Sequence, residues 1–192
     1  MNNNILLEIL TSIFNVIVTP LTQYLFSHRG KLYVFYKRES PSHSIGKYGI
    51  IGDFFVIPMS FDLQNTSRIN KVCRDLSLWL YKDYKPVKKF NQVKDTYQKN
   101  ERTKEITNEC QYGNDVKTYS FNIGPKSVKS IRCFFMINKC QIEAKNQIVL
   151  AYYDEKNKQH LYKLFDAKEI LDNKIFEPDS DWIKADTDDT DK

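Results

Sequence analysis

The chain has 192 residues, 41% of them hydrophobic and 14% aromatic, with 29 Lys and Arg against 24 Asp and Glu. That length predicts one domain with at most a small appendage, and the hydrophobic content excludes a wholly disordered chain. The formal net charge of +5 is too small to indicate nucleic-acid binding by itself, and six Gly and six Pro exclude a collagen-like or low-complexity chain.

The charge is distributed unevenly along the chain. Residues 1–165 hold 25 Lys and Arg against 14 Asp and Glu, a net charge of +11, whereas residues 166–192 hold 4 against 10, a net charge of −6. The acidic segment 167–192 therefore predicts a flexible C-terminal tail. The alternative is a tail that folds back on the basic body and competes with an anionic partner.

The N-terminal segment, residues 1–28, contains an apolar run over residues 5–26 with the period of a helix. Its length matches the about 20 residues of a membrane span, so we expect a hydrophobic single-pass membrane helix that Pro20 interrupts near its last turn. Its polar face would allow helices to associate into homo-oligomers through hydrogen bonds between the small side chains of Thr11, Ser12, Asn15, Thr19 and Thr22. The alternatives are a helix packed on its own domain or lying in the membrane interface, and a cleaved signal sequence.

Residues 1–4, before the apolar run, contain no Lys or Arg, whereas four basic residues follow the run, namely Arg29, Lys31, Lys37 and Arg38. By the positive-inside rule, the body of a single-pass protein would lie on the cytoplasmic side. No CxxC pair occurs among the four cysteines, Cys73, Cys110, Cys133 and Cys140. This spacing agrees with a reducing compartment, whereas two disulfides would fit an exported domain.

From residue 29 to residue 166 the hydrophobic pattern changes to the two-residue period of β-strands. Pro58 indicates that its strand is an edge strand or contains a bulge, because proline has no amide hydrogen. Short strands separated by turns predict a mainly β domain, either a β-sandwich or a small barrel. We expect strands at 31–37, 54–61, 72–81, 118–123, 128–137, 147–153 and 159–165, a further short one near 87–92, and one helical turn within 167–172.

Two stretches of this body resemble parts of an immunoglobulin-like β-sandwich. Residues 56–67, which end in an Asn-Thr-Ser turn, and the alternating strand at 72–81 are similar to the opening of such domains in bacterial membrane-anchored accessory proteins. The strand, Gly-Pro-Lys-Ser turn and strand at 118–137 resemble a later hairpin of the same fold. The resemblance covers residues 31–165 and implies architecture without catalytic residues. The Cys-Trp-Cys signature of antibody domains is not met, because no second Cys follows Trp79 at the usual distance.

Motifs for enzymatic chemistry are missing from the sequence. The three histidines, His28, His43 and His160, form no HExxH or HxxxH pair, and no GxSxG, GxGxxG or GxxxxGK[ST] run occurs. The carboxylates Asp154 and Glu155 fall in an expected hairpin loop, where such pairs are usually solvated. We therefore expect a non-enzymatic protein with no catalytic residue, metal or cofactor.

A basic loop is the most informative polar feature, with aromatic residues between its cations. Its basic residues are Lys82, Lys85, Lys88, Lys89, Lys94, Lys99, Arg102 and Lys104. The interleaved aromatic residues are Tyr81, Tyr84, Phe90 and Tyr97. The simplest interpretation is a solvated hairpin whose aromatic residues belong to the core. The others are contact with an anionic membrane surface or a partner, and nucleic-acid binding.

Together these features predict a membrane-anchored binding or accessory module that recognises a protein partner through its β-sandwich. A second hypothesis is a membrane effector, as in defence or toxin action, whose N-terminal helix self-associates under the control of a sensing β-domain. A third is nucleic-acid binding by the loop at 82–104.

Overall fold

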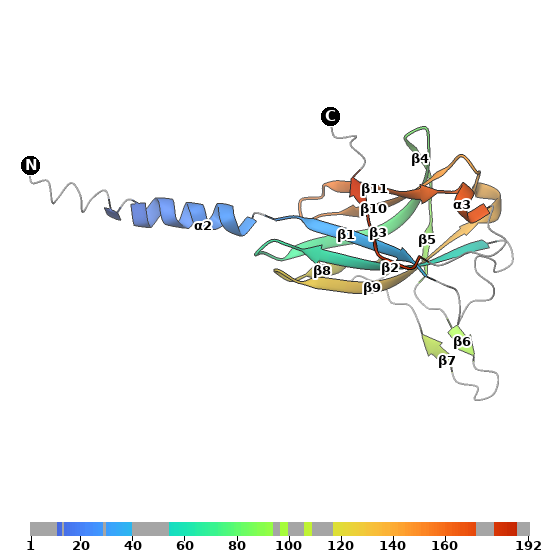
Figure 1. The fold of residues 1–192 in the computed structure, drawn as a ribbon, viewed down its shortest axis with the longest axis horizontal. Coiled ribbons are helices and arrows are strands. Elements are labelled where there is room, and N and C mark those ends of the chain that lie inside the picture. Colours follow the sequence, from blue (N-terminus) through green and yellow to red (C-terminus); the bar gives the residue numbers. More distant parts are fainter. Residues whose placement is uncertain are drawn as a thin grey trace, which may run out of the picture.

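The computed structural model describes residues 11–12, 14–28, 30–39, 54–93, 97–99, 106–108, 117–171 and 179–187. Within this part, two antiparallel sheets form a sandwich, as the sequence predicted (Figure 1). The first sheet has the order β12-β1-β2-β9-β5, with β1 at Leu32–Arg38, β2 at Phe54–Asn65, β5 at Asn91–Val93, β9 at Val128–Asn138 and β12 at Ile183–Lys184. The second has the order β13-β11-β10-β3-β4, with β3 at Lys71–Lys82, β4 at Lys85–Lys89, β10 at Gln147–Tyr153, β11 at Gln159–Asp166 and β13 at Asp186–Thr187.

Smaller elements complete the described part. Strand β8 (Phe121–Ile123) pairs with the start of β3, and β6 (Tyr97–Lys99) pairs with β7 (Ile106–Asn108) in a separate two-stranded sheet. The helical elements are the π-helix η1 at Phe14–Val18, α2 at Thr19–His28, the 3-10 helix η2 at Lys139–Gln141 and the single turn α3 at Lys168–Leu171.

The core lies between the two sheets and follows the predicted alternation. In β3 the side chains of Leu76, Leu78 and Leu80 are fully buried. They share this core with Phe135 of β9, whose ring meets the ring of Tyr119 edge-on at a centroid distance of 5.6 Å. Burial of each such side chain stabilises the fold by about 1.5–3 kcal/mol, so the facing sheets hold the domain together.

Pro58 lies in the central strand of the first sheet, not at an edge. Strand β2 pairs with β9 without a register shift from Phe54 to Gln64, so there is no bulge at this position either. The Pro58 carbonyl accepts a hydrogen bond from the amide of Glu39, just beyond the end of β1. In an antiparallel ladder the amide and carbonyl of one residue point to the same neighbour. The nitrogen of Pro58, which has no hydrogen to donate, therefore points toward the side where β1 has ended. No hydrogen bond between β2 and β9 is lost.

Part of the acidic C-terminal segment lies on the sandwich, where the sequence predicted a tail. Strand β12 pairs with β1 and β13 pairs with β11, so residues 179–187 connect the edges of both sheets. Ala185, between the two strands, is buried in the core. The carboxylate of Asp179 forms an ion pair with the guanidinium of Arg38 at 2.7 Å. The described part of the acidic segment thus folds back on the basic body.

Helix α2 projects from one end of the sandwich (Figure 1). The π-helix ends at Val18 and the α-helix begins at Thr19, next to Pro20. Proline has no amide hydrogen and therefore cannot donate a further hydrogen bond of the π-helix. Phe14, Val16, Leu21 and Tyr24 are each more than half exposed. No helix among the described residues is long and apolar enough to cross a membrane.

The described cysteines differ in their exposure to solvent. Cys73 and Cys133 are buried in the core, and Cys140 is exposed. Burial raises the pKa of the Cys73 thiol, which therefore stays protonated and behaves as a small apolar side chain. Cys110 lies outside the described residues.

Candidate functional site

A pocket of about 510 Å³ opens at the end of the sandwich from which α2 projects. Five segments that are far apart in the sequence line it: residues 30–34, 71–72, 152–155, 158–162 and 184–185. Four lysines are among the lining residues, Lys31, Lys71, Lys158 and Lys184. The cavity is therefore basic, with space for an anionic group.

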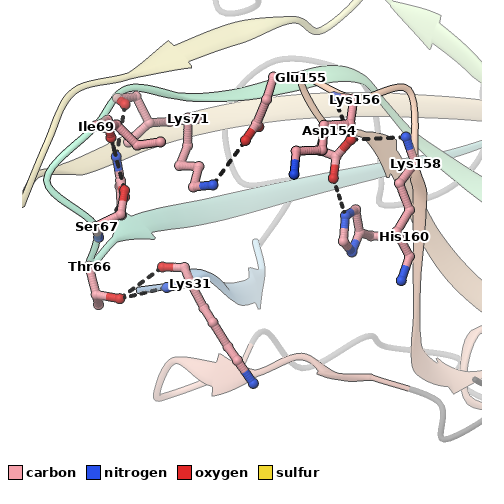
Figure 2. A network of polar contacts seen from close by, with 12 residues as sticks. Lys31, Thr66, Ser67, Ile69, Lys71, Asp154, Glu155, Lys156, Lys158 and His160 are labelled. Carbon is pink, nitrogen blue, oxygen red and sulfur yellow. Dashed lines mark hydrogen bonds and ion pairs between the residues drawn. The ribbon is translucent and has the colours of Figure 1, made fainter. Parts of the chain in front are cut away.

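The two carboxylates of the pocket are already paired (Figure 2). Asp154 Oδ2 lies 3.0 Å from His160 Nε2, while Asp154 Oδ1 accepts the backbone amides of Lys156 and Lys158. Glu155 Oε1 accepts a 2.9 Å hydrogen bond from the ammonium of Lys71. Both carboxylates of the lining are thus engaged, and the lining lysines outnumber them by four to two.

The same contacts keep both carboxylates ionised. Burial raises the pKa of Asp154, but the hydrogen bonds from His160 and from the two backbone amides outweigh it and hold the pKa below its usual value. Burial likewise opposes ionisation of Glu155, and the Lys71 ammonium outweighs it and lowers the pKa. Neither group is a candidate general acid at neutral pH.

Stacked aromatic rings are part of the pocket lining. The Tyr152 ring lies parallel to the His160 ring at a centroid distance of 4.9 Å and to the Tyr162 ring at 6.0 Å. Burial is the main cause that raises the pKa values of both tyrosine hydroxyls. Both tyrosines are therefore neutral at physiological pH and contribute uncharged rings to the pocket lining.

A tight junction joins α2 to this end of the sandwich. Gly30 has a φ of +118°, and a Cβ at this position would lie 2.6 Å from the backbone nitrogen of Ser67. The amide of the next residue, Lys31, donates a hydrogen bond to Thr66 Oγ1 at 2.9 Å (Figure 2). The Lys31 carbonyl accepts a hydrogen bond from the Thr66 amide at 3.0 Å. Only glycine fits at this position. The point at which the chain leaves α2 and enters the sandwich, called the exit point of the helix, is therefore held against the β2–β3 turn.

The β2–β3 turn is in turn held by a buried side chain. Asn65 Nδ2 lies within hydrogen-bond distance of the carbonyls of Ile69, Ile123 and Gly124, at 2.8, 3.1 and 2.8 Å. Asn65 Oδ1 accepts the Ser67 amide at 2.9 Å. This asparagine thus ties together the end of β2, the start of β3 and the end of β8.

The predicted basic loop lies elsewhere in the molecule. Lys82, Lys85, Lys88 and Lys89 belong to the β3–β4 hairpin (residues 82–89), at the opposite end of β3 from the pocket. Lys82 pairs with Glu143 at 3.2 Å, and Lys89 pairs with Asp75. Lys99 is in β6, and Lys94, Arg102 and Lys104 lie outside the described residues.

The aromatic residues of this loop have different environments. Phe90 is buried in the core, so it is not available to stack on a nucleic-acid base. Tyr84 is 76% exposed at the tip of the hairpin. Tyr81 is half-buried, and nothing is described of the Tyr97 side chain.

The predicted polar face of the N-terminal helix is partly described. Thr22 donates its hydroxyl to the Thr19 carbonyl at 2.8 Å, and Thr19 donates to the Phe14 carbonyl at 3.4 Å. Thr11 and Ser12 are exposed, and nothing is described of the Asn15 side chain.

The pocket residues could not be grouped from the sequence. Lys71 and Glu155 are 84 positions apart, and only the pairing of β3 with β10 brings them together. The one available signal was the hairpin at 147–165, whose turn carries Asp154 and Glu155. Among the described residues no group of three or more His, Cys, Asp or Glu side chains could hold a metal ion.

The two facing antiparallel sheets define an immunoglobulin-like domain. A family model described as the YopI Ig-like domain matches residues 34–165, and the chain belongs to this family. The resemblance stated from the sequence is thereby confirmed. No curated protein and no solved structure matches the chain. An Ig-like domain is consistent with a protein-interaction module.

Proposed function

We propose that the chain is a non-enzymatic interaction module whose sandwich recognises a partner protein while its N-terminal segment holds it at a membrane. The single observation that carries the proposal is the separation of two surfaces. The exposed apolar side chains of α2 lie at one end of the molecule, and the exposed β3–β4 hairpin lies toward the other (Figure 1).

The tether rests on the character of α2. Residues 14–28 include no Asp, Glu, Lys or Arg, and their exposed apolar side chains Phe14, Val16, Leu21 and Tyr24 are costly to leave in water. The 15 residues of η1 and α2 are fewer than the about 20 of a span. A single pass with the sandwich on the cytoplasmic side would therefore also use residues of the first 13.

The partner-binding surface rests on Tyr84. Asp83 and Tyr84 both have positive φ, at +50° and +62°, as in the type I′ turns that favour Asn and Gly. A tyrosine in this conformation is strained, and strained residues concentrate at functional sites. Exposed Val87 and the exposed cations Lys85 and Lys88 adjoin it on β4. Tyrosine is enriched at protein interfaces, where a few aromatic and arginine side chains carry most of the binding energy.

Two experiments test the two halves of the proposal. For the tether, we expect the full chain in the membrane fraction and a variant lacking residues 1–28 in the soluble fraction. A soluble full chain would contradict the tether.

For the partner surface, a photo-crosslinking residue at Tyr84 should give a discrete protein adduct in cells. The same residue at exposed Asn122 in β8 is the control. Tyr84→Asn keeps a residue suited to the turn and should be at least as stable as the original chain, yet it should abolish partner capture. Equal adducts at both positions would refute recognition by the hairpin.

A further inference from the structure

Basic side chains gather at the end of the sandwich that adjoins α2. They come from the start of β1, the β2–β3 turn, the start of β3, and the turns that follow β8 and β10. We define the helix-proximal face by the basic residues Lys31, Arg68, Lys71, Lys126, Lys156 and Lys158. All but Lys71 are exposed. Lys31, Lys71 and Lys158 of this face also line the pocket, and Lys31 directly follows the junction with the helix.

A backbone hydrogen bond and an ion pair hold these segments together. The amide of Lys126 donates to the Ser67 carbonyl at 3.0 Å, so the β8–β9 turn lies against the β2–β3 turn. The ion pair between Lys71 and Glu155 joins the start of β3 to the β10–β11 turn (Figure 2). The cations are therefore fixed on one rigid surface, although each lies in a different part of the sequence.

The positive charge of the helix-proximal face is not fully neutralised by carboxylates near it. The pocket carboxylates Asp154 and Glu155 are occupied by His160 and Lys71. In the part of the chain that the structure describes, Lys31, Arg68 and Lys156 form no ion pair. Three exposed cations thus remain for an external anion.

The position of the face decides which anion is favoured. Gly30 fixes the exit of α2 against the β2–β3 turn, so a membrane that holds α2 meets the helix-proximal face first. Strand β3 has 12 residues from Lys71 to Lys82, which at about 3.3 Å per residue separates its ends by about 36 Å. The Debye length at physiological ionic strength is about 8 Å. The cations of the β3–β4 hairpin are therefore screened from the charge of that membrane.

We propose that the helix-proximal face binds the anionic headgroups of the membrane surface at which α2 is held. The lysines around the pocket receive a headgroup phosphate, and the whole face fixes the orientation of the sandwich. The β3–β4 hairpin then points away from the lipid. This inference rests on the proposed tether and adds the lipid class and the surface that recognises it.

The test uses the full chain with two kinds of vesicle, phosphatidylcholine alone and an equimolar mixture with phosphatidylserine. Co-sedimentation measures affinity, and amide hydrogen exchange locates the contact. We expect tighter binding to the anionic vesicles, with slower exchange at residues 66–69 and 154–158 and unchanged exchange at residues 82–85. The double variant Arg68→Gln/Lys156→Gln should lose about 30-fold in affinity, which is about 2 kcal/mol for two near-surface cations.

The matched control is Lys85→Gln/Lys88→Gln, which removes the same charge from the hairpin and should bind as tightly as the original chain. Equal binding to both vesicles without protection would overturn the headgroup proposal and leave the tether standing. Binding to neither vesicle would overturn both. Protection at residues 66–69 by polyglutamate, with none by anionic vesicles, would assign the face to an acidic polypeptide and also overturn the proposal.

Discussion

Replacement of Asn65 by alanine should be among the most damaging polar substitutions in this domain. The side chain is almost completely buried, and its amide faces three backbone carbonyls while its oxygen accepts the Ser67 amide and hydroxyl. The –NH2 group has two hydrogens, so the three carbonyls share them. The variant therefore loses about four hydrogen bonds that join three chain segments.

The expected cost follows from these contacts. Each hydrogen bond contributes about 1 kcal/mol net, and a buried group left without a partner costs about 1–3 kcal/mol. Thr66 and Arg68 in the same turn are accessible, so water can reach part of the vacated site. We expect Asn65→Ala to lower the free energy of unfolding by about 3 kcal/mol.

A charged isostere separates hydrogen bonding from packing. Asn65→Asp keeps the shape but places a carboxylate against the three carbonyls, which should raise its pKa in the folded state. The folded state then binds a proton more tightly than the unfolded state. The cost of the substitution should therefore be largest at pH 7 and should decrease as the pH falls toward about 4.

Urea unfolding of both variants measures these effects. Asn122→Ala, at an exposed position of β8, is the control and should change stability by no more than about 0.5 kcal/mol. A cost of Asn65→Ala as small as that of the control would refute the reasoning. So would a cost of Asn65→Asp that does not vary with pH.

Three further substitutions test the junction, the C-terminal segment and the pocket. Gly30→Ala should cost about 2 kcal/mol in urea unfolding, because φ is +118° and the new Cβ would meet the Ser67 backbone. Asp179→Ala removes the carboxylate that accepts hydrogen bonds from the amide and guanidinium of Arg38 and leaves Glu169 as its remaining ion-pair partner. The variant should exchange the Ala185 amide faster, and unchanged exchange would contradict this. Because the folded-state pKa of Asp154 is lowered, its carboxylate stabilises the fold above about pH 4 and loses that effect as the pH falls through the folded pKa. Asp154→Asn should therefore be less stable at pH 7 yet lose less stability in acid, and equal acid sensitivity would contradict the assignment.

The sequence by itself determined the fold class and most of the strands. In residues 72–81 and 128–137, one face of each strand must be apolar to be buried between two sheets, and that requirement is visible as a two-residue period. The hairpin at 147–165 was also predictable, because its turn residues interrupt two apolar runs. These features depend on local spacing alone.

Only the tertiary structure decided where the strands and charges lie. Pro58 occupies a central strand because β1 ends beside it, which no local pattern reveals. The acidic residues 179–187 pair with both sheets, and Arg38, 141 positions from Asp179, supplies the opposite charge at the start of this segment. The cations of the helix-proximal face and those of the β3–β4 hairpin lie at opposite ends of β3. Screening makes those ends electrostatically independent, so the charge that matters for binding is set by the path of the chain and not by its composition.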